Sequence, residues 1–262
     1  MDAEGNLRCW RREGNDLQSF RSTPRKIMRI NDLYSARSSA DIGKYERAFS
    51  RIELDASKAL SKMLDSHSPI LDSSDSDAWI KFLLAQRART PARIAWAKEF
   101  SQFELRQALG QEDPEFDELN TEKNLATCLE YVEKNYPHMT KDFHLETIME
   151  IIDSPKNSDP LRRMRWFVRK YQCVSIIISD NPLILWGNLH QTTCILALPI
   201  SPDSVFFAVS KPEFQKKIMS ENVLEAAAKI NHDQAIQAQR LIVGDAQPQF
   251  LLERFCRNKD LP

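Results

Sequence analysis

Polar side chains continue the apolar stripe of a predicted helix near the middle of the chain. Gln86 comes four residues after Phe82, and Thr90 comes four residues after Gln86, so all three fall on one helix face. Arg89 lies three residues beyond Gln86, and Arg93 three beyond Thr90. Burying such groups without hydrogen-bond partners costs roughly 2–7 kcal/mol each. Either another part of the protein or a ligand must therefore satisfy them.

Two more polar residues stand where apolar elements should bury them. Asp180 ends the β-branched stretch "SIIIS" at 175–179, and Asn231 lies seven residues after Leu224 on an alanine-rich helix face. The end of a buried strand is a rigid place from which to hold a polar side chain at a cleft. We therefore expect Gln86, Asp180 and Asn231 to meet in a polar cleft between a helical part of the chain and a sheet.

A structural interpretation competes with the functional one for each of these residues. Asp180 precedes Asn181 and Pro182, which is typical of a turn, so its carboxylate could end a strand through an Asx-type hydrogen bond. An ion pair between Arg89 and Asp180 would be an ordinary structural bridge. Asn231 could cap a neighbouring loop. The sequence leaves both interpretations open.

Binding of a small anionic ligand is the first function that this pattern predicts. Arg89 and Arg93 would hold an anionic group through forked hydrogen bonds, while Gln86 and Asn231 would fix its orientation. This chemistry requires no histidine and no metal ion. Accordingly, the sequence predicts no cofactor and no metal site.

A hydrolase, for example a nuclease acting in defence, is the second function. Asp180 would act as general base or hold a hydrated divalent ion, and Arg89 would stabilise developing negative charge. Asp203 or Asp233 could complete a pair of carboxylates, but the sequence does not place them. A non-catalytic scaffold or partner-binding protein is the third possibility, so the sequence does not decide whether the chain is an enzyme.

Signatures of common enzymes are absent from the sequence. It contains no G-x-x-x-x-G-K-S/T, G-x-G-x-x-G, H-E-x-x-H or G-x-S-x-G motif. Loops that bind phosphate through their backbone are rich in glycine, and the chain has only six glycines, so we do not expect such a loop. The histidines are spread too widely to predict a metal site. The five cysteines are scattered without a C-x-x-C pair, which favours a reducing, cytoplasmic location: Cys9, Cys128, Cys173, Cys194 and Cys256.

The charge balance gives no general attraction to nucleic acid or to an anionic membrane. Lys and Arg number 36 against 37 Asp and Glu, for a net charge of -1. Arginines at 8, 11 and 12 and at 162, 163 and 165 could contact nucleic acid locally, although such residues more often form solvated faces. The apolar runs are far shorter than the roughly 18–20 residues that cross a bilayer. The polar N-terminus carries no secretory signal, and we expect no membrane association.

Hydrophobic spacing predicts one domain over residues 1–262, made of three regions. Residues 1–43 contain strands and loops, with strand-like pieces at 7–10 and 26–30. Residues 44–160 form a helical part, and its first helix has apolar residues at alternating spacings of four and three. These residues are Tyr45, Phe49, Ile52, Ala56, Ala59 and Met63.

Further helices follow in the helical part. Thr90 before Pro91 predicts an N-cap and the first residue of a helix, unless this helix and the one before it form a single kinked helix. Its apolar stripe would run through Ile94, Ala97, Phe100 and Phe103. Two more helices are predicted at about 122–135 and 141–153.

Residues 161–262 are predicted to form a sheet with flanking helices. Strands are expected at 173–178, 194–198 and 205–209, and the turn sequence "SPDS" at 201–204 would join the last two in a hairpin. A helix is expected over about 221–241, and another after Pro248. The predicted fold class is therefore α+β, with a helical half (about 44–160) and a small antiparallel sheet with flanking C-terminal helices.

Four segments together resemble a known family. "FLLAQRARTPARIAW", "IIISDNPL", "ALPISPDSVFF" and "INHDQAIQAQRLIVG" occur in this order, and "STPRKIMRINDLYS" at 22–35 is similar to another part of the same family. The family is the mainly bacterial one catalogued as domain of unknown function 4238. The resemblance covers roughly residues 7–245 and is carried by the combination of segments rather than by any single one.

The resemblance supplies no activity, but it directs attention to particular positions. It adds Arg87 and Asn181 to the residues found by periodicity, and it includes Gln86, Arg89, Thr90, Asp180 and Asn231. Longer members of the family open with a His-Tyr-Val-Pro-type motif and an apolar segment. We expect this chain to begin after the place where those would stand.

Overall fold

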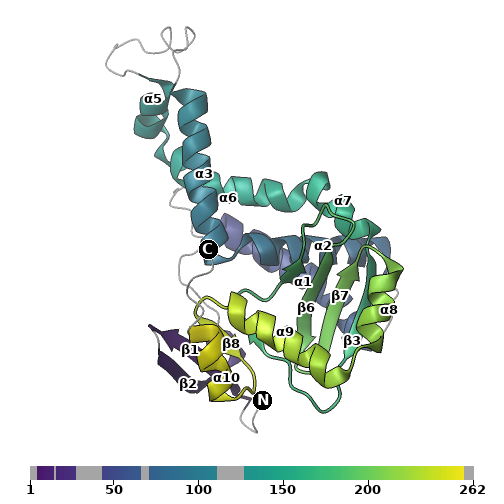
Figure 1. Cartoon of the computed structure of the whole chain (residues 1–262). Coiled ribbons are helices and arrows are strands. Elements are labelled where there is room, and N and C mark those ends of the chain that lie inside the picture. The colour runs from purple at the N-terminus through teal and green to yellow at the C-terminus, as the bar shows by residue number, and fades with distance from the viewer. Residues whose placement is uncertain (1–4, 15, 28–42, 66–70, 111–126, 257–262) are drawn as a thin grey trace.

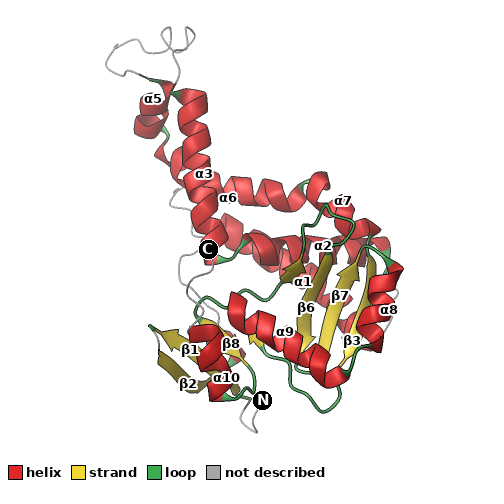
Figure 2. Cartoon of the chain, viewed as in Figure 1, coloured by secondary structure: helices red, strands yellow, loops and turns green. Residues whose placement is uncertain are grey.

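The computed structural model describes residues 5–14, 16–27, 43–65, 71–110 and 127–256. Helices pack around two antiparallel four-stranded sheets (Figures 1 and 2), which confirms the predicted α+β fold class. The strand orders are β3-β7-β6-β5 in the first sheet and β2-β1-β8-β4 in the second. No helix in the described ranges combines the length and the apolar character needed to cross a membrane.

The first sheet contains the most deeply buried strands. Its elements are β3 (Arg165–Lys170), β5 (Ile184–Trp186), β6 (Ile195–Ser201) and β7 (Ser204–Val209). The last two form the predicted hairpin, in which Ser201 pairs with Ser204. Every residue of β7 is buried, so helices must cover both faces of this sheet.

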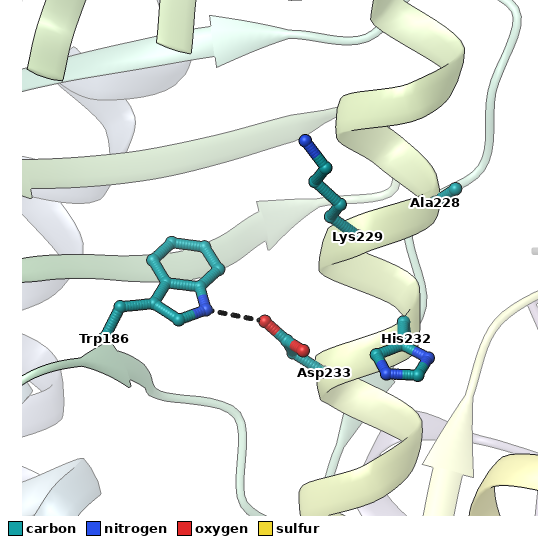
Figure 3. A pocket seen from close by; sticks show the side chains of 5 residues that line it. All are labelled: Trp186, Ala228, Lys229, His232 and Asp233. Atoms are coloured by element: carbon teal, nitrogen blue, oxygen red, sulfur yellow. Dashed lines mark hydrogen bonds between the residues drawn. The ribbon is translucent and has the colours of Figure 1, made fainter. Parts of the chain in front are cut away.

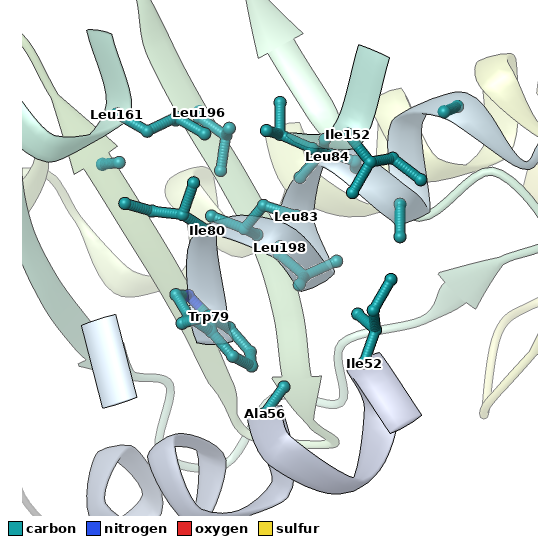
Figure 4. Packing of buried hydrophobic residues seen from close by; sticks show 14 of the residues in the cluster. Ile52, Ala56, Trp79, Ile80, Leu83, Leu84, Ile152, Leu161, Leu196 and Leu198 are labelled. Carbon is teal, nitrogen blue, oxygen red and sulfur yellow. The ribbon is translucent and has the colours of Figure 1, made fainter. Parts of the chain in front are cut away.

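Helices α1 (Lys44–Asp65), α2 (Ser73–Ala88) and α7 (Pro155–Arg163) cover one face of the first sheet. Leu83 and Leu84 of α2 pack beside Leu196 and Leu198 of β6 in the same apolar cluster (Figure 4). The prediction for α1 is confirmed, because all six of its expected apolar residues are buried.

Helices α3 (Pro91–Leu109) and α5 (Cys128–Asn135) extend away from the sheet (Figure 1), whereas α6 (Pro137–Asp153) places Leu145, Ile148 and Ile152 in the same apolar cluster as α2. The hydroxyl of Thr90 accepts a hydrogen bond from the backbone N–H of Arg93 at 3.4 Å, which confirms the predicted N-cap. Of the helices predicted at 122–135 and 141–153, the second begins earlier, at Pro137. Residues 122–126 lie outside the described part.

The predicted stripe of α3 is wrong in its second half. Ile94, Ala97 and Ser101 are buried, whereas Phe100 and Phe103 are 40% and 57% exposed. A spacing of three residues turns by about 300° around a helix, so each step drifts by about 60°. Three such steps bring Phe103 to the side opposite Ile94, while Ser101, seven residues on, returns to the buried face.

Helices α8 (Pro212–Ser220) and α9 (Val223–Gln237) cover the other face of the first sheet (Figure 1). Ala227 and Ile230 of α9 share an apolar cluster with Ala197 and Phe207 of the sheet. The helix predicted to reach residue 241 ends at Gln237 instead. It ends there because residues 241–243 are used as a strand of the second sheet.

The second sheet joins the two ends of the described chain. β1 (Leu7–Glu13) pairs with β2 (Asp16–Ser22) and with β8 (Leu241–Val243), which in turn pairs with β4 (Ile178–Ser179). The strand predicted at 7–10 is confirmed. The one predicted at 26–30 is wrong at its start, because Lys26 ends a 3-10 helix over Pro24–Lys26, and residues 28–30 lie outside the described part.

A small apolar core closes this sheet. Trp10 of β1 is 2% exposed, donates from its indole N–H to the carbonyl of Gly244 at 3.0 Å, and packs with Leu251 and Phe255. The latter two belong to the helix predicted after Pro248, which is confirmed as α10 (Pro248–Leu251) with a π-helical continuation over Leu252–Cys256.

The Arg12 side chain ties β1 to the C-terminal helix. Its guanidinium donates to the carbonyl of Phe255 at 2.8 Å and to the carbonyl of Gln239, and it lies 5.1 Å from the centre of the Phe255 ring. A planar guanidinium can reach two carbonyls in fixed directions at once, which an ammonium on a flexible stem cannot do as well.

Arg12→Lys should therefore lower the free energy of unfolding by about 1–3 kcal/mol, the range for lost hydrogen bonds to a charged group. Urea unfolding followed by circular dichroism measures the change. Arg11→Lys is the matched control, because Arg11 is exposed and its guanidinium lies 4.9 Å from the centre of the Phe20 ring. Its effect should stay within about 0.5 kcal/mol, and equal losses in both variants would contradict the assigned role of Arg12.

Candidate functional site

The predicted site residues occur at two separate places. Gln86, Arg87, Arg89, Thr90 and Arg93 lie at the junction of α2 and α3, whereas Asp180, Asn181 and Asn231 lie where β4 meets α9. The first sheet stands between them, because α2 packs on one of its faces and α9 on the other. The structure therefore does not bring the two groups into one cleft.

Arg89 and Thr90 have structural partners at the junction. The guanidinium of Arg89 donates to the carboxylate of Glu53 in α1, and the Arg89 backbone N–H closes the end of α2 on the carbonyl of Ala85. This ion pair replaces the bridge to Asp180 that the sequence allowed. Thr90 is occupied as the N-cap of α3. These two residues join helices together.

Gln86 and Arg87 differ from these neighbours. Both side chains are half-buried, and within the described ranges neither forms a hydrogen bond or an ion pair. Neither has a polar atom among those that are fully buried without a partner, so their polar ends reach the surface. The amide of Gln86 and the guanidinium of Arg87 therefore lie at the boundary between the protein interior and water.

Arg87 is held in an environment that does not favour its charge. Burial lowers the pKa of its guanidinium, and the nearby charge of Arg93 lowers it further. The thiol of Cys194, directly before β6, is close enough to interact, and burial raises the pKa of that thiol while Arg87 acts in the opposite direction. Arg87 thus lies where helix α2 meets the sheet.

Arg93 completes a pair of guanidinium groups. It is exposed in the first turn of α3, and its guanidinium lies 5.9 Å from the centre of the Trp96 ring. Two neighbouring guanidinium groups repel each other unless an anion lies between them. Guanidinium groups of this kind are chemically suited to hold a phosphate or carboxylate group through forked hydrogen bonds.

Asp180 binds backbone on the other side of the sheet. Its carboxylate accepts hydrogen bonds from the N–H groups of Gln239 at 2.8 Å, Arg240 at 2.8 Å and Leu241 at 3.2 Å. Burial raises the pKa of this carboxyl, and the three N–H groups act against that shift. The aspartate at the end of the β-branched stretch therefore fixes the link between α9 and β8.

Amide side chains of α9 supply hydrogen bonds to the stretch before and after Asp180. Asn231 accepts from the N–H of Ile177 at 2.9 Å and donates to the carbonyl of Ser175 at 3.0 Å. Gln234 accepts from the N–H of Ser179 at 2.9 Å and donates to the carbonyl of Pro182 at 2.7 Å.

A third amide, Gln237, donates to the carbonyl of Asn181, which also accepts from the hydroxyl of Ser179 at 3.0 Å. These contacts explain why most of the strand predicted at 173–178 is absent and only Ile178 belongs to β4. The backbone there bonds to side chains of a helix rather than to a neighbouring strand.

The carboxylates considered as partners of Asp180 are engaged elsewhere. Asp203 accepts from the hydroxyls of Ser201 at 2.6 Å and Ser204 at 2.9 Å, and Asp233 accepts from the indole N–H of Trp186 at 2.7 Å. In the described part of the chain, no three His, Cys, Asp or Glu side chains group as metal ligands. The catalytic role of Asp180 stays a prediction that no observation supports.

The two arginine groups considered for nucleic acid have mostly local contacts. Arg8 lies 4.6 Å from the centre of the Trp10 ring, and Arg12 binds the carbonyls described above. Arg162 pairs with Asp77 at 2.9 Å, and Arg165 donates to Gln215 at 3.2 Å. Binding of nucleic acid is not tested by these contacts.

One pocket was missed by sequence reasoning. It has a volume of about 360 Å³ and is lined by Trp186 of β5 and by four residues of α9: Ala228, Lys229, His232 and Asp233 (Figure 3). The sequence did indicate that Lys229 and Asp233 lie on the same side of a helix, because they are four residues apart and adjoin the apolar Ile230. Nothing in the sequence showed that the edge of the sheet would place a tryptophan opposite them.

Comparison with known proteins identifies one family. The model of the family described as "Protein of unknown function (DUF4238)" matches residues 2–247, nearly the whole chain. No curated protein and no solved structure matches the chain. The function must therefore be argued from the side chains themselves.

Asp180→Ala should destabilise the fold, because it removes the acceptor of three backbone N–H groups. We expect the free energy of unfolding to fall by about 1–3 kcal/mol, measured by urea unfolding. Asp245→Ala is the control, since this carboxylate is exposed and lies at the long distance of 3.7 Å from the guanidinium of Arg8. If Asp180→Ala unfolds at the same urea concentration as the wild type, the structural role of Asp180 is wrong.

Proposed function

Because the chain belongs to the family of proteins of unknown function DUF4238, we propose its function from its own side chains. It binds a small anionic ligand at the junction of α2 and α3. Arg87 and Arg93 hold the anion, and Gln86 orients it. The ligand class is a phosphate or carboxylate compound, because two guanidinium groups match the oxygens of either group through forked hydrogen bonds.

The observation that carries this proposal is the half-buried guanidinium of Arg87, which has no acidic partner within the described ranges and whose charge is repelled by that of Arg93. A structural arginine in this position would be expected to pair with a carboxylate, as Arg89 does with Glu53. An arginine that is partly desolvated and repelled by its neighbour costs stability. A bound anion would offset both costs.

This proposal keeps part of the site expected from sequence and drops part of it. Arg89 is left out because its charge is offset by Glu53, and Asn231 is left out because it binds backbone on the opposite face of the sheet. Arg87 remains at the boundary between helical part and sheet, through its proximity to Cys194. The proposed cleft is therefore at this boundary, and it contains Gln86, Arg87 and Arg93.

The cellular location of the protein is part of the same proposal. We expect a bacterial, cytoplasmic protein, and the five cysteines, scattered in sequence without a C-x-x-C pair, support a reducing compartment. Hydrolysis through Asp180 is not included, because the carboxylate of that residue accepts three backbone N–H groups.

A partner-binding role is the second candidate. Trp96, Phe100 and Phe103 are 45%, 40% and 57% exposed on α3, and the spacing i, i+4, i+7 places them on one face of the helix. If this face joins copies of the chain, sedimentation velocity should show association that rises with concentration. Trp96→Ser with Phe103→Ser should abolish it, and a wild type that stays monomeric would contradict this candidate.

Arg87→Gln tests the anion-binding proposal directly. Inorganic pyrophosphate is the probe, titrated at low salt by isothermal calorimetry. We expect the variant to bind at least tenfold more weakly than the wild type, since a hydrogen bond to a charged group contributes about 1.5–3 kcal/mol and 1.4 kcal/mol is tenfold. Without pyrophosphate its thermal midpoint should equal or exceed that of the wild type, because the repulsion by Arg93 is gone.

Arg163→Gln is the matched control, since Arg163 is exposed on α7 and has the same charge. It should bind pyrophosphate as the wild type does. Equal weakening by both variants would show a general effect of net charge. Unchanged binding by Arg87→Gln, or a wild type without any affinity for pyrophosphate, sulfate or citrate, would contradict the proposal.

A further inference from the structure

The pocket between β5 and α9 is a second place where function could lie. It is on the face of the first sheet opposite to the arginine pair, since Trp186 and α9 belong to the apolar cluster on that face. Its volume of about 360 Å³ is in the range of pockets that hold small molecules, about 300–1,000 Å³. It is therefore separate from the site proposed above.

The fold explains why these side chains face each other. β5 is an edge strand, and its alternation turns Ile184 and Trp186 toward α9 while Leu185 packs on the opposite face. On α9, the buried Ala227 and Ile230 fix which side of the helix meets the sheet. Lys229 and Asp233 come one turn apart at the rim of that contact.

A hydrogen bond fixes the orientation of the Asp233 carboxylate in the pocket. The indole N–H of Trp186 donates to Oδ2 of Asp233 at 2.7 Å (Figure 3). Within the described ranges the other carboxylate oxygen accepts no hydrogen bond. The bond thus fixes both the indole ring and the carboxylate, and it leaves one oxygen to accept from a ligand.

The charges around the pocket favour a cation. Lys229 forms an ion pair with Glu221, and Glu225 also attracts it. Counting Asp233, three carboxylates stand against two cations, the ammonium of Lys229 and the guanidinium of Arg169, which donates to the backbone carbonyl of Glu221, so the local net charge is -1. The ammonium of Lys229 is therefore already offset. An anion entering the pocket would meet a surplus of negative charge, whereas a cation would be attracted.

The geometry points to a binding site for a small organic amine. We propose that its ammonium group donates to the free oxygen of Asp233 and lies against the indole face of Trp186, which attracts cations through its ring quadrupole. Its methylene groups would contact Ala228 and the aliphatic stem of Lys229. No covalent step is involved.

Binding of putrescine to the full-length chain tests this inference. The signal is the indole N–H resonance of Trp186 in a ¹H–¹⁵N NMR spectrum, identified by its loss in Trp186→Phe. We expect putrescine to shift it with saturation at millimolar concentration. The diol 1,4-butanediol, which has the same carbon chain without charge, should leave it unchanged.

Asp233→Asn separates charge from packing, because its amide oxygen can still accept from the indole of Trp186. It should bind putrescine at least tenfold more weakly than the wild type. Glu213→Gln is the control, because it also removes one negative charge, at an exposed residue of α8, and it should bind putrescine as the wild type does.

Three results would overturn the inference: equal shifts with 1,4-butanediol, unchanged affinity in Asp233→Asn, or a shift produced by acetate but not by putrescine. Pyrophosphate binding at Arg87 is a separate readout, so failure at one site can be told from failure at the other.

Discussion

Burial of the first sheet on both faces is the constraint on which the rest of the structure depends. β7 has no exposed residue, so α1, α2 and α7 must cover one face while α8 and α9 cover the other. A sheet buried in this way is a barrier between side chains of the two helical layers. The first sheet therefore separates the polar residues of α2 from those of α9. These residues are similar in type, and the sequence had led us to expect that they would meet.

The two groups of polar residues consequently have different tasks. On the α9 side, Asn231, Gln234 and Asp180 satisfy backbone groups of chain segments that do not continue as regular strands, and they link the first sheet to the second. On the α2 side, Arg87 and Gln86 reach the surface without partners in the described ranges. Side chains of the first kind specify the fold, and those of the second kind are the ones for which we propose binding of an anion.

Sequence reasoning succeeded where local chemistry decides structure. The stripe of α1, the Thr90 cap and the 201–204 turn depend on neighbours within a few residues, and each was predicted. It failed where distant partners decide. β2 and β3 are rich in polar or charged residues and become strands by pairing with β1 and β7. Neither the side-chain bonds from α9 nor the position of Trp186 opposite Asp233 has a local signal.

The most direct test of this division of tasks is an NMR titration of ¹⁵N-labelled protein with pyrophosphate, in which arginine Nε–H groups and backbone amides are observed together. The Nε–H signals of Arg87 and Arg93 should shift with one common affinity, while the amides of Gln239, Arg240 and Leu241 around Asp180 stay in place. Shifts at those three amides, with the two arginines unaffected, would contradict the account.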